Sequence, residues 1–417
     1  MTTARRARSV RLAGLGLAAV TALVASGCGS SSGAASKPPA SITFVGAEYS
    51  AKTGPYWRSV AQAFQKKTGI TVKVEMYSWN DIHQQVSTMV QTNQLPDVLN
   101  LDTFSAYAQE GLLWPAKDVE STALSSNIPQ NLQDAGQYNG TAYGIPLIAS
   151  TSTLFYNKTL FGKAHLAGPP VTMSQLASDA KAIAKLPGGN AGFAVSLGPE
   201  APQIDWAMMM YNFGGDYVTN GKWSINSTAN VSALSFLAGL AKDKATEVNP
   251  GRTNRTTSGT WQLFASGKAG MVIGQSALAA QLAQSPQVSY GIAPMPSATG
   301  PSRSLGISDF MMAFKKPGNQ AAVKKFLAFA FAKSNYDTFV RNEGLLPITS
   351  DEQQALASNG QFAPYLAALK TAVFAPVGQK SWDTVLGAMK NSIGLALQGQ
   401  NPKTILDQLQ STATSGS

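Results

Sequence analysis

Apolar residues between positions 41 and 102 follow two alternating periodicities, one typical of strands and one typical of helices. Tyr56, Val60 and Phe64 recur at helical spacing, whereas residues 70–76 alternate apolar and polar side chains, as a half-buried strand does. The predicted segments are strand 41–50, helix 55–69, strand 70–76, helix 82–93 and strand 95–102. Strands separated by helices predict a parallel sheet with right-handed crossovers.

The ends of these three strands carry polar and aromatic side chains. The pairs are Glu48-Tyr49, Ser78-Trp79 and Asp102-Thr103. Ligands of parallel sheets bind outside the carboxyl ends of the strands. The pattern therefore predicts a binding site where these three ends converge.

Amphipathic helices are also predicted further along the chain, over 171–186, 230–243 and 321–333. Thr172 and Gln175 have the spacing of a capping box at the start of the first of these helices. A last helix begins with Asn401 as its cap and Pro402 at its first position. Residues 413–417 are expected to form a frayed tail.

Residues 1–27 have the pattern of a secretory signal peptide. Four arginines precede an uncharged stretch of thirteen residues, 12–24, and small residues follow it. A membrane-spanning helix needs about 20 apolar residues. The segment 25–28, ASGC, resembles the bacterial lipobox, in which the cysteine is lipidated. We expect Cys28, the only cysteine in the chain, to anchor the protein at the extracytoplasmic face of the bacterial cell membrane.

Residues 28–40 read as a flexible tether, because serine and glycine dominate them and two prolines close them. Subtracting the four signal arginines from the formal net charge of +10 leaves +6, a mild excess for so long a chain. No run of Lys and Arg with interleaved aromatic residues occurs, so nucleic-acid binding is not expected. With 44% hydrophobic and 13% charged residues, the rest of the chain is globular and long enough for two lobes.

Side chains suited to catalysis are sparse. The only histidines, His83 and His165, lie in no nucleophile elbow, HExxH motif or metal-ligand spacing, so a structural or surface role is the better interpretation. We expect no enzyme activity, no metal and no cofactor. Glycoside hydrolysis needs only two carboxylates. A pair drawn from Glu48, Asp102 and Glu200 therefore keeps a surface glycosidase as a distant alternative.

Aromatic side chains near predicted turns and element ends are the stronger signal. They are Tyr49, Trp79, Trp206, Tyr211, Trp261 and Trp382. Sugars present apolar C–H faces that stack on aromatic rings, and their hydroxyl groups bind carboxylates and amides at the rim of a pocket. Core packing is favoured for Trp57 and Trp223. For Trp79 and Trp382, sugar stacking and core packing stay equally open.

Six segments occur in a familiar order. They read LPDVLNLDTFSAYAQEGLL, YNGTAYGIPLIASTSTLFYNKTLF, PVTMSQLASDAKAI, FASGKAGMVIG, YGIAPMPS and GISDFMMAFKKPGNQAAVKKFLAFAFAKSNYDTFVRNEGLLPITS. The set resembles the family 1 extracellular solute-binding proteins of bacterial ABC importers, the group that includes maltose-binding protein. The resemblance extends over nearly all of the chain after the tether.

The resemblance implies an α/β fold of two lobes, with strands that cross at a hinge and lobes that close on a ligand. The crossings fall near 148–151, 306–309 and 346–350. Lobe one covers residues 41–150 and 309–348, and lobe two covers residues 151–308 and 349–412. The implied function is to capture a mono- or oligosaccharide as a monomer and deliver it to the transmembrane subunits of an ABC permease.

The resemblance also implies roles for particular residues. Asp102, Glu48 and Glu200 match acidic contacts to sugar, and Trp382 matches a stacking tryptophan. The family often has a tryptophan shortly after the segment GKAGMVIG, where this chain has Gln275 and Ser276, and that departure argues against a long maltodextrin. The expected ligand-binding residues are Glu48, Tyr49, Trp79, Asp102, Glu200, Trp206, Gln275, Asp309 and Trp382.

An anionic sugar, such as a sugar phosphate or a uronide, is the alternative ligand. Arg252, Arg255 and Arg303 could clamp a phosphate or carboxylate with their planar guanidinium groups, although exposed loop arginines are the simpler interpretation. Iron-binding sites in the family need clusters of histidine and tyrosine, and this chain has too few histidines to form one. A neutral sugar is therefore the leading expectation.

Overall fold

The computed structural model describes residues 41–256, 258–284, 287–370 and 372–415. The predicted signal peptide, the lipidated Cys28 and the tether lie outside the described residues. Residues 38–417 form one compact unit. In the described part, no helix combines the length and the apolar character needed to cross a membrane.

The first sheet has six strands: β1 (Ser41–Ala47), β2 (Thr71–Tyr77), β3 (Val98–Leu101), β6 (Ile145–Thr151), β13 (Leu305–Ala313) and β14 (Val373–Phe374). Its order is β14-β13-β3-β1-β2, and β6 also pairs with β13. β1 runs parallel to β2 and β3, which confirms the parallel sheet predicted from the alternating patterns. β13 comes from far along the chain and runs antiparallel to both β3 and β6.

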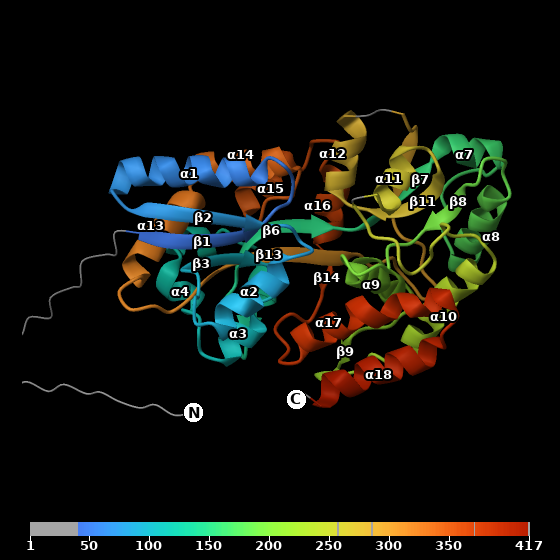
Figure 1. Ribbon diagram of the computed structural model, residues 1–417. Coiled ribbons are helices and arrows are strands. Elements are labelled where there is room, and N and C mark those ends of the chain that lie inside the picture. The colour runs from blue at the N-terminus through green and yellow to red at the C-terminus, as the bar shows by residue number, and fades with distance from the viewer. Residues whose placement is uncertain (1–40, 257, 285–286, 371, 416–417) are drawn as a thin grey trace, which may run out of the picture. The chain divides into compact units, whose positions relative to one another are not determined.

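Helices cover both faces of the first sheet, because successive residues of a strand point to opposite sides. Ile42 and Phe44 of β1 pack in the cluster that contains α1 (Thr53–Thr68), α13 (Gln320–Ala330) and α14 (Lys333–Glu343). Val45 and Ala47 pack instead with α2 (Ile82–Gln91) and α3 (Ser105–Gln109). Figure 1 shows α1 and α14 on one side of the sheet and α2 and α3 on the other.

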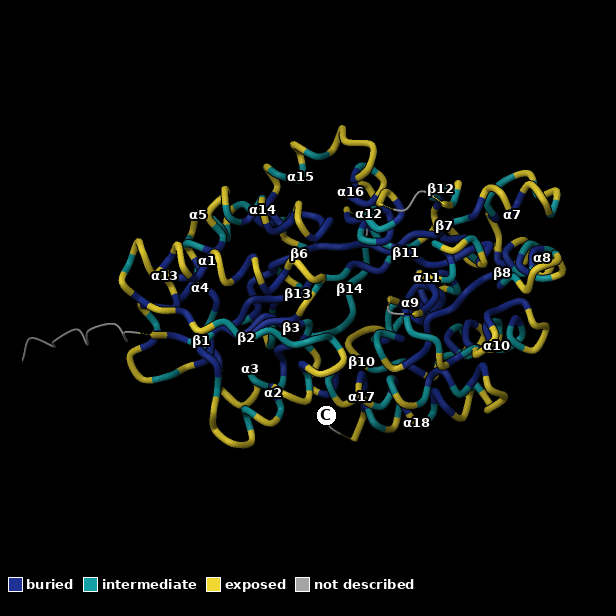
Figure 2. The backbone as a smooth tube through the Cα atoms, turned by 45° about the horizontal axis from the view of Figure 1, so that its top comes forward, coloured by how far each residue is buried: buried dark blue, intermediate teal, exposed yellow. Residues whose placement is uncertain are grey.

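The second sheet has the order β12-β7-β11-β8, with strands β7 (Thr153–Asn157), β8 (Ala191–Ala194), β11 (Ala269–Gly274) and β12 (Tyr290–Ala293). A second hydrophobic core packs against this sheet. Its helices are α8 (Met173–Ala184), α9 (Pro202–Asn212), α10 (Thr228–Lys242), α17 (Trp382–Ser392) and α18 (Pro402–Ser415). The inner strands of both sheets are buried, whereas β2, β12 and β14 are mostly half-buried and the outer faces of the helices are exposed (Figure 2).

Three chain segments lie side by side near the point where the chain leaves the first sheet. β6 and β7 are separated by Ser152 alone, so the chain passes directly from the first sheet to the second. β13 pairs with β6 from Gly306 opposite Thr151 onward, and Ala149 forms an isolated bridge with Leu346. The family resemblance places crossings near the same segments, and their role as a hinge stays a prediction.

The remaining elements are short or lie on the periphery. They are α4 (Ala116–Val119), α5 (Thr122–Ser125), α6 (Gln130–Ala135), β4 (Gln137–Tyr138), β5 (Thr141–Ala142), α7 (Lys158–Lys163), β9 (Val218–Thr219), β10 (Lys222–Trp223), α11 (Thr260–Ala265), α12 (Ser276–Gln284), α15 (Ser350–Leu356), α16 (Ala363–Leu369) and the 3-10 helix η1 (Ile393–Gln398). The β4–β5 hairpin turns on Asn139-Gly140, both at positive φ, as a tight two-residue turn requires.

Helix ends follow the local signals in the sequence. The capping box of α8 is present, with Thr172 and Gln175 bonded reciprocally to each other's backbone amides. Asn401 caps α18 by accepting from the Lys403 amide at 2.9 Å. The predicted frayed tail differs from the structure, because α18 continues to Ser415. Ala413 is buried in the second core, and this packing holds the last turn in place.

Candidate functional site

A cavity of about 240 Å³ is lined by residues from elements of both sheets. Predicted ligand-binding residues in its lining are Tyr49, Trp79, Asp102, Glu200, Gln275, Asp309 and Trp382, together with Arg255 from the anionic-ligand candidates. The strand ends of β1, β2 and β3 therefore converge on one cavity, as the parallel sheet requires. Glu48, Trp206, Arg252 and Arg303 are not among the lining residues.

Tyr49 is held at the end of β1 by its backbone and by its hydroxyl group. Its amide donates to Oγ1 of Thr53 at 3.0 Å, and its hydroxyl group donates to Oδ2 of Asp309 at 2.8 Å. Oδ1 of Asn100 lies 3.2 Å from the same hydroxyl oxygen. The ring meets Trp79 edge to face, with centroids 5.7 Å apart. Burial raises the pKa of Tyr49, so the hydroxyl group stays protonated and can donate.

Asp309 of β13 lines the cavity at a point where the pairing of β13 with β6 is interrupted by a β-bulge. Asp309 pairs with Ile148 but Phe310 pairs with Pro146, so Leu147 is an extra residue on β6. Such bulges bend a strand and re-aim its side chains. Burial, and then the nearby charge of Asp102, raise the pKa of Asp309 to about 7. This carboxyl group is therefore partly protonated near neutral pH.

Asp102 follows β3 and lies beside His83 of α2, with Oδ1 3.1 Å from Nε2. The negative charge of Asp102 raises the pKa of His83, against the effect of burial. Burial also opposes ionisation of Asp102, but the charges of His83 and Lys390 outweigh it and leave the pKa of Asp102 below its usual value. The sequence suggests a structural or surface role for His83, whereas the structure places it in the cavity lining.

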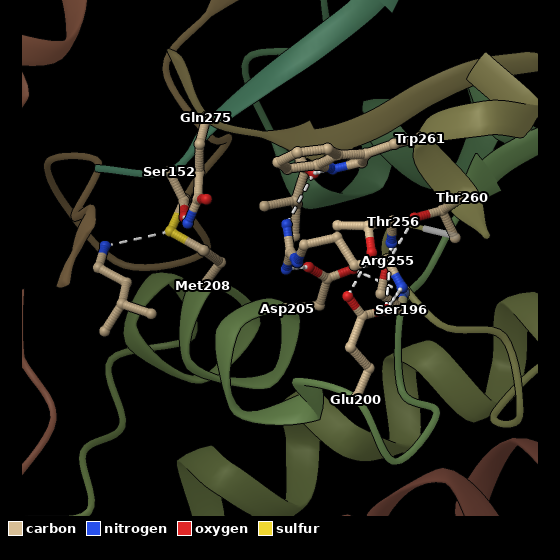
Figure 3. A network of polar contacts seen from close by, with 12 residues as sticks. Ser152, Ser196, Glu200, Asp205, Met208, Arg255, Thr256, Thr260, Trp261 and Gln275 are labelled. Carbon is tan, nitrogen blue, oxygen red and sulfur yellow. Dashed lines mark hydrogen bonds and ion pairs between the residues drawn. The ribbon is translucent and has the colours of Figure 1, made fainter. Parts of the chain in front are cut away.

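Glu200 holds the loop that follows α10 (Figure 3). Its Oε2 accepts from the amides of Arg255 at 2.9 Å and Thr256 at 3.2 Å. Its Oε1 accepts from the Thr256 hydroxyl group at 2.5 Å. Both carboxylate oxygens are thus bonded within the protein, although the side chain lines the cavity.

Arg255 is almost fully buried and forms an ion pair with Asp205 (Figure 3). Nη1 also donates to the carbonyl group of Ile273 at 3.2 Å, and the guanidinium carbon lies 5.5 Å from the ring centroid of Trp261. Oδ2 of Asp205 accepts from the Ser196 amide. The charge of Arg255 is therefore balanced inside the protein.

The other two candidate arginines lie outside the cavity lining. Nη2 of Arg303 is 3.4 Å from Oδ2 of Asp216, and the guanidinium group stacks over Tyr211 at 5.0 Å. Arg252 is exposed, and its Nε donates to Gln398 at 3.3 Å.

The candidate tryptophans have different surroundings. Trp206 is fully buried in the second core. Trp382 touches the cavity, but only 1% of its surface is exposed, and it packs edge to face against Tyr217 at 5.0 Å. Trp79 is half-buried, so more of its ring is accessible than that of Trp382. Trp261 also lines the cavity and donates through Nε1 to the Ile273 carbonyl group.

Several lining residues carry no signal in the sequence patterns. Lys390 of α17, Glu343 at the end of α14 and Ser150 of β6 belong to segments whose local periodicity predicts only a helix or a buried strand. Gln203 of α9 likewise lines the cavity. Only their position in the folded chain brings them to the site. Among the described residues, no group of three His, Cys, Asp or Glu side chains could hold a metal ion.

Comparisons with known proteins find binding proteins among the relatives of this chain. A Brucella abortus (strain 2308) protein, named as a binding protein, is 28% identical over 368 residues, covering 86% of this chain and 89% of its own. The diacetylchitobiose binding protein of Streptomyces coelicolor is 25% identical, with 73% and 71% of the two chains covered. The fold is similar to that of a Thermotoga lettingae ABC transporter solute-binding protein bound to α-D-tagatose. That match has a TM-score of 0.76 and 21% identity, and it covers 90% of this chain and 99% of the other.

The structural likeness confirms the predicted two-lobe α/β fold. The sequence profile of the bacterial extracellular solute-binding proteins matches residues 59–364, which is well over half of the chain. The chain therefore belongs to the bacterial extracellular solute-binding protein family.

Proposed function

We propose that this protein is the lipid-anchored, extracytoplasmic solute-binding component of an ABC importer. It captures a mono- or oligosaccharide between its two lobes and delivers it to the permease. The observation that carries the proposal is the cavity, which is lined by the aromatic residues Trp79 and Trp261 and by the carboxyl groups of Asp102 and Asp309. Rings stack on the C–H faces of a sugar, and carboxylates accept from its hydroxyl groups.

The names of two relatives support a sugar as the solute, since one binds diacetylchitobiose and another was crystallised with tagatose. The division into lobe one (41–150 and 309–348) and lobe two (151–308 and 349–412) is part of the same proposal. So are the lipid on Cys28, the monomeric state and the transfer to a permease.

Glycoside hydrolysis by a pair drawn from Glu48, Asp102 and Glu200 is less well supported than binding. Hydrolysis needs one carboxyl group as acid and a second, free carboxylate as base or nucleophile. Glu200 has both oxygens bonded to the loop at Thr256, and Glu48 is not in the cavity lining. The family to which the chain belongs is one of extracellular solute-binding proteins.

An anionic sugar is the second candidate, and Lys390 is the observation that favours it. Lys390 lines the cavity and lies near enough to His83 and Asp102 to lower the pKa of both. A phosphate or uronate group could pair with its ammonium group. Because Arg255 is already paired with Asp205, this candidate relies on one lysine.

A thermal-shift screen of the domain from residue 37 onwards tests the proposal. The panel is D-glucose, D-tagatose, maltose, N,N′-diacetylchitobiose, glucose 6-phosphate and glucuronate. A ligand present at 100 times its dissociation constant stabilises the folded state by about 2.7 kcal/mol. We expect a rise in unfolding temperature with one class of sugar and no chemical change in that sugar.

The site is then tested with Asp102→Asn, and Asp351→Asn serves as an exposed control. The first variant should weaken binding of the sugar found in the screen about 10-fold, because it removes a charged acceptor. The control should bind like the unaltered protein. A panel without any stabilising sugar contradicts the proposal, and turnover of the sugar contradicts the assignment as a binding protein.

A further inference from the structure

One carboxylate oxygen of Glu343 has no hydrogen-bond partner among the described residues. Glu343 is 8% exposed and lines the cavity. Its Oε1 accepts from the Thr53 hydroxyl group at 2.8 Å. Its Oε2 is buried and makes no hydrogen bond with the described residues. A buried acceptor without a donor is costly, so native structures rarely retain one without a use.

The position of Glu343 on its own helix makes the cost larger. It is the last residue of α14, and Gly344 ends that helix in the left-handed conformation. Carbonyl groups give this end of a helix a partial negative charge, which disfavours a carboxylate. No Lys, Arg or His of the described residues forms an ion pair with Glu343 within 4.0 Å. Glu343 thus combines a buried oxygen without a donor, an unfavourable place at the helix end and no counter-charge. Such a combination at a cavity is expected where a residue serves function and not stability.

The Glu343 carboxylate is also held in place before any ligand arrives. Thr53, which donates to it, accepts from the amides of Tyr49 and Ser50 at 3.0 Å each. The next residue is fixed as well, because the Gly344 carbonyl group accepts from Ser276 at 2.8 Å. Glu343 and Tyr49 thus belong to one hydrogen-bonded unit. A preorganised acceptor contributes more to binding than a mobile one.

We propose that Glu343 is a ligand-binding residue that selects an uncharged sugar, with its Oε2 accepting a hydrogen bond from a sugar hydroxyl group. The proposal rests on the function proposed above and narrows its ligand class. A hydroxyl group donates to a carboxylate, whereas a phosphate or uronate group near Glu343 and Asp102 meets like charge. The Glu343 side chain therefore favours neutral sugars and discriminates against acidic ones.

Glu343→Gln is the central variant, because it keeps the size of the side chain and an oxygen for Thr53 while removing the charge. Glu110→Gln, at an exposed position, is the matched control. Glu343→Asp keeps the charge but withdraws the carboxylate by one methylene group. All variants are made in the domain from residue 37 onwards, which spans the single compact unit. Calorimetry measures dissociation constants for D-glucose, D-tagatose, maltose, N,N′-diacetylchitobiose, glucose 6-phosphate and glucuronate, and thermal unfolding is followed without sugar.

Glu343→Gln should weaken binding of the neutral sugar about 10-fold or more, because a charged acceptor is lost. Its preference for neutral over acidic sugars should shrink, whereas Glu343→Asp should bind weakly and keep that preference. Glu110→Gln should match the unaltered protein. If the role of Glu343 is purely structural, Glu343→Gln changes the unfolding temperature but not the preference for neutral over acidic sugars.

Unchanged affinity and preference in Glu343→Gln overturn the proposal, as does failure of both Glu343 variants to fold. If the unaltered protein binds only glucuronate or glucose 6-phosphate, the solute-binding function stands and the Glu343 proposal falls. If it binds no member of the panel, the sugar function fails, and the Glu343 proposal fails with it.

Discussion

At the residue scale, two carboxyl groups that face the same cavity ionise over different pH ranges. Asp102 is kept ionised by His83, whereas burial and the charge of Asp102 raise the pKa of Asp309 to about 7. Near neutral pH the pair of Asp102 and Asp309 therefore supplies one charged acceptor and one carboxyl group that can also donate. A sugar, whose hydroxyl groups both donate and accept, matches such a pair.

The raised pKa of Asp309 predicts a pH dependence of stability. In the unfolded chain an aspartate has a pKa of about 3.9. Between about pH 4 and pH 7 the folded state thus binds more protons at Asp309, and the free energy of unfolding falls as the pH rises through this window. Asp309→Asn should remove this contribution and flatten the curve. Urea unfolding at pH 4.5, 5.5, 6.5 and 7.5 measures the difference.

Other buried carboxyl groups share this direction, since burial raises the pKa of Asp383 to about 6 and that of Glu247 to about 7. The unaltered protein and Asp309→Asn must therefore be compared with each other, with Asp351→Asn as the exposed control. Parallel curves for the unaltered protein and Asp309→Asn would show that Asp309 has an ordinary pKa.

The buried ion pair of Arg255 and Asp205 predicts a large loss of stability on mutation. Asp205→Asn leaves a buried guanidinium group without its counter-charge, which typically costs about 3–5 kcal/mol of unfolding free energy. Arg252→Ala, at an exposed position in the same loop, should change it by only about 0.5 kcal/mol. Urea unfolding at pH 7 compares them. Equal, small effects would mean that Arg255 finds other partners or water.

At the element scale, local signals in the sequence predict the helices well. The expected helices 55–69, 82–93, 171–186 and 321–333 correspond to α1, α2, α8 and α13, with ends that differ by a few residues. Periodicity succeeds here because each helix buries one face against a sheet. It says little about β13, whose place between β3 and β6 depends on strands far away in the chain.

The capping box of α8 predicts a modest loss of stability at this scale. Thr172→Ala removes the side-chain acceptor for the Gln175 amide and should lower the unfolding free energy by about 1 kcal/mol. Ser174→Ala, an exposed change within the first turn of α8, should have little effect. Urea midpoints of both variants measure this. If Ser174→Ala costs as much as Thr172→Ala, the cap is not the cause.

At the scale of the whole molecule, the cavity is lined from elements of both sheets, and the chain passes directly from one sheet to the other between β6 and β7. A ligand that contacts residues of both lobes binds the closed form better, so it shifts the equilibrium toward closure. We expect the radius of gyration to fall when the sugar identified by thermal shift is added, and small-angle X-ray scattering measures it. An unchanged radius at saturating sugar would argue against closure on the ligand.

The sequence by itself determined the order of the first three strands and two helices, the parallel start of the first sheet and the family. It also indicated the strand ends at Tyr49, Trp79 and Asp102, because periodicity, caps and motifs are local properties of a chain. Only the tertiary structure decided which side chains meet. His83 lies beside Asp102, Arg255 is neutralised by Asp205, and Glu343 lines the cavity with an oxygen to which no described residue donates a hydrogen bond.

Burial likewise separated residues that look alike in the sequence. Trp206 lies inside the core, whereas Trp79 remains accessible at the cavity. The bulge opposite Asp309 depends on the register of β6 against β13, which the chain reaches only after more than a hundred intervening residues. Such long-range contacts depend on packing of the whole chain, and no local pattern encodes them.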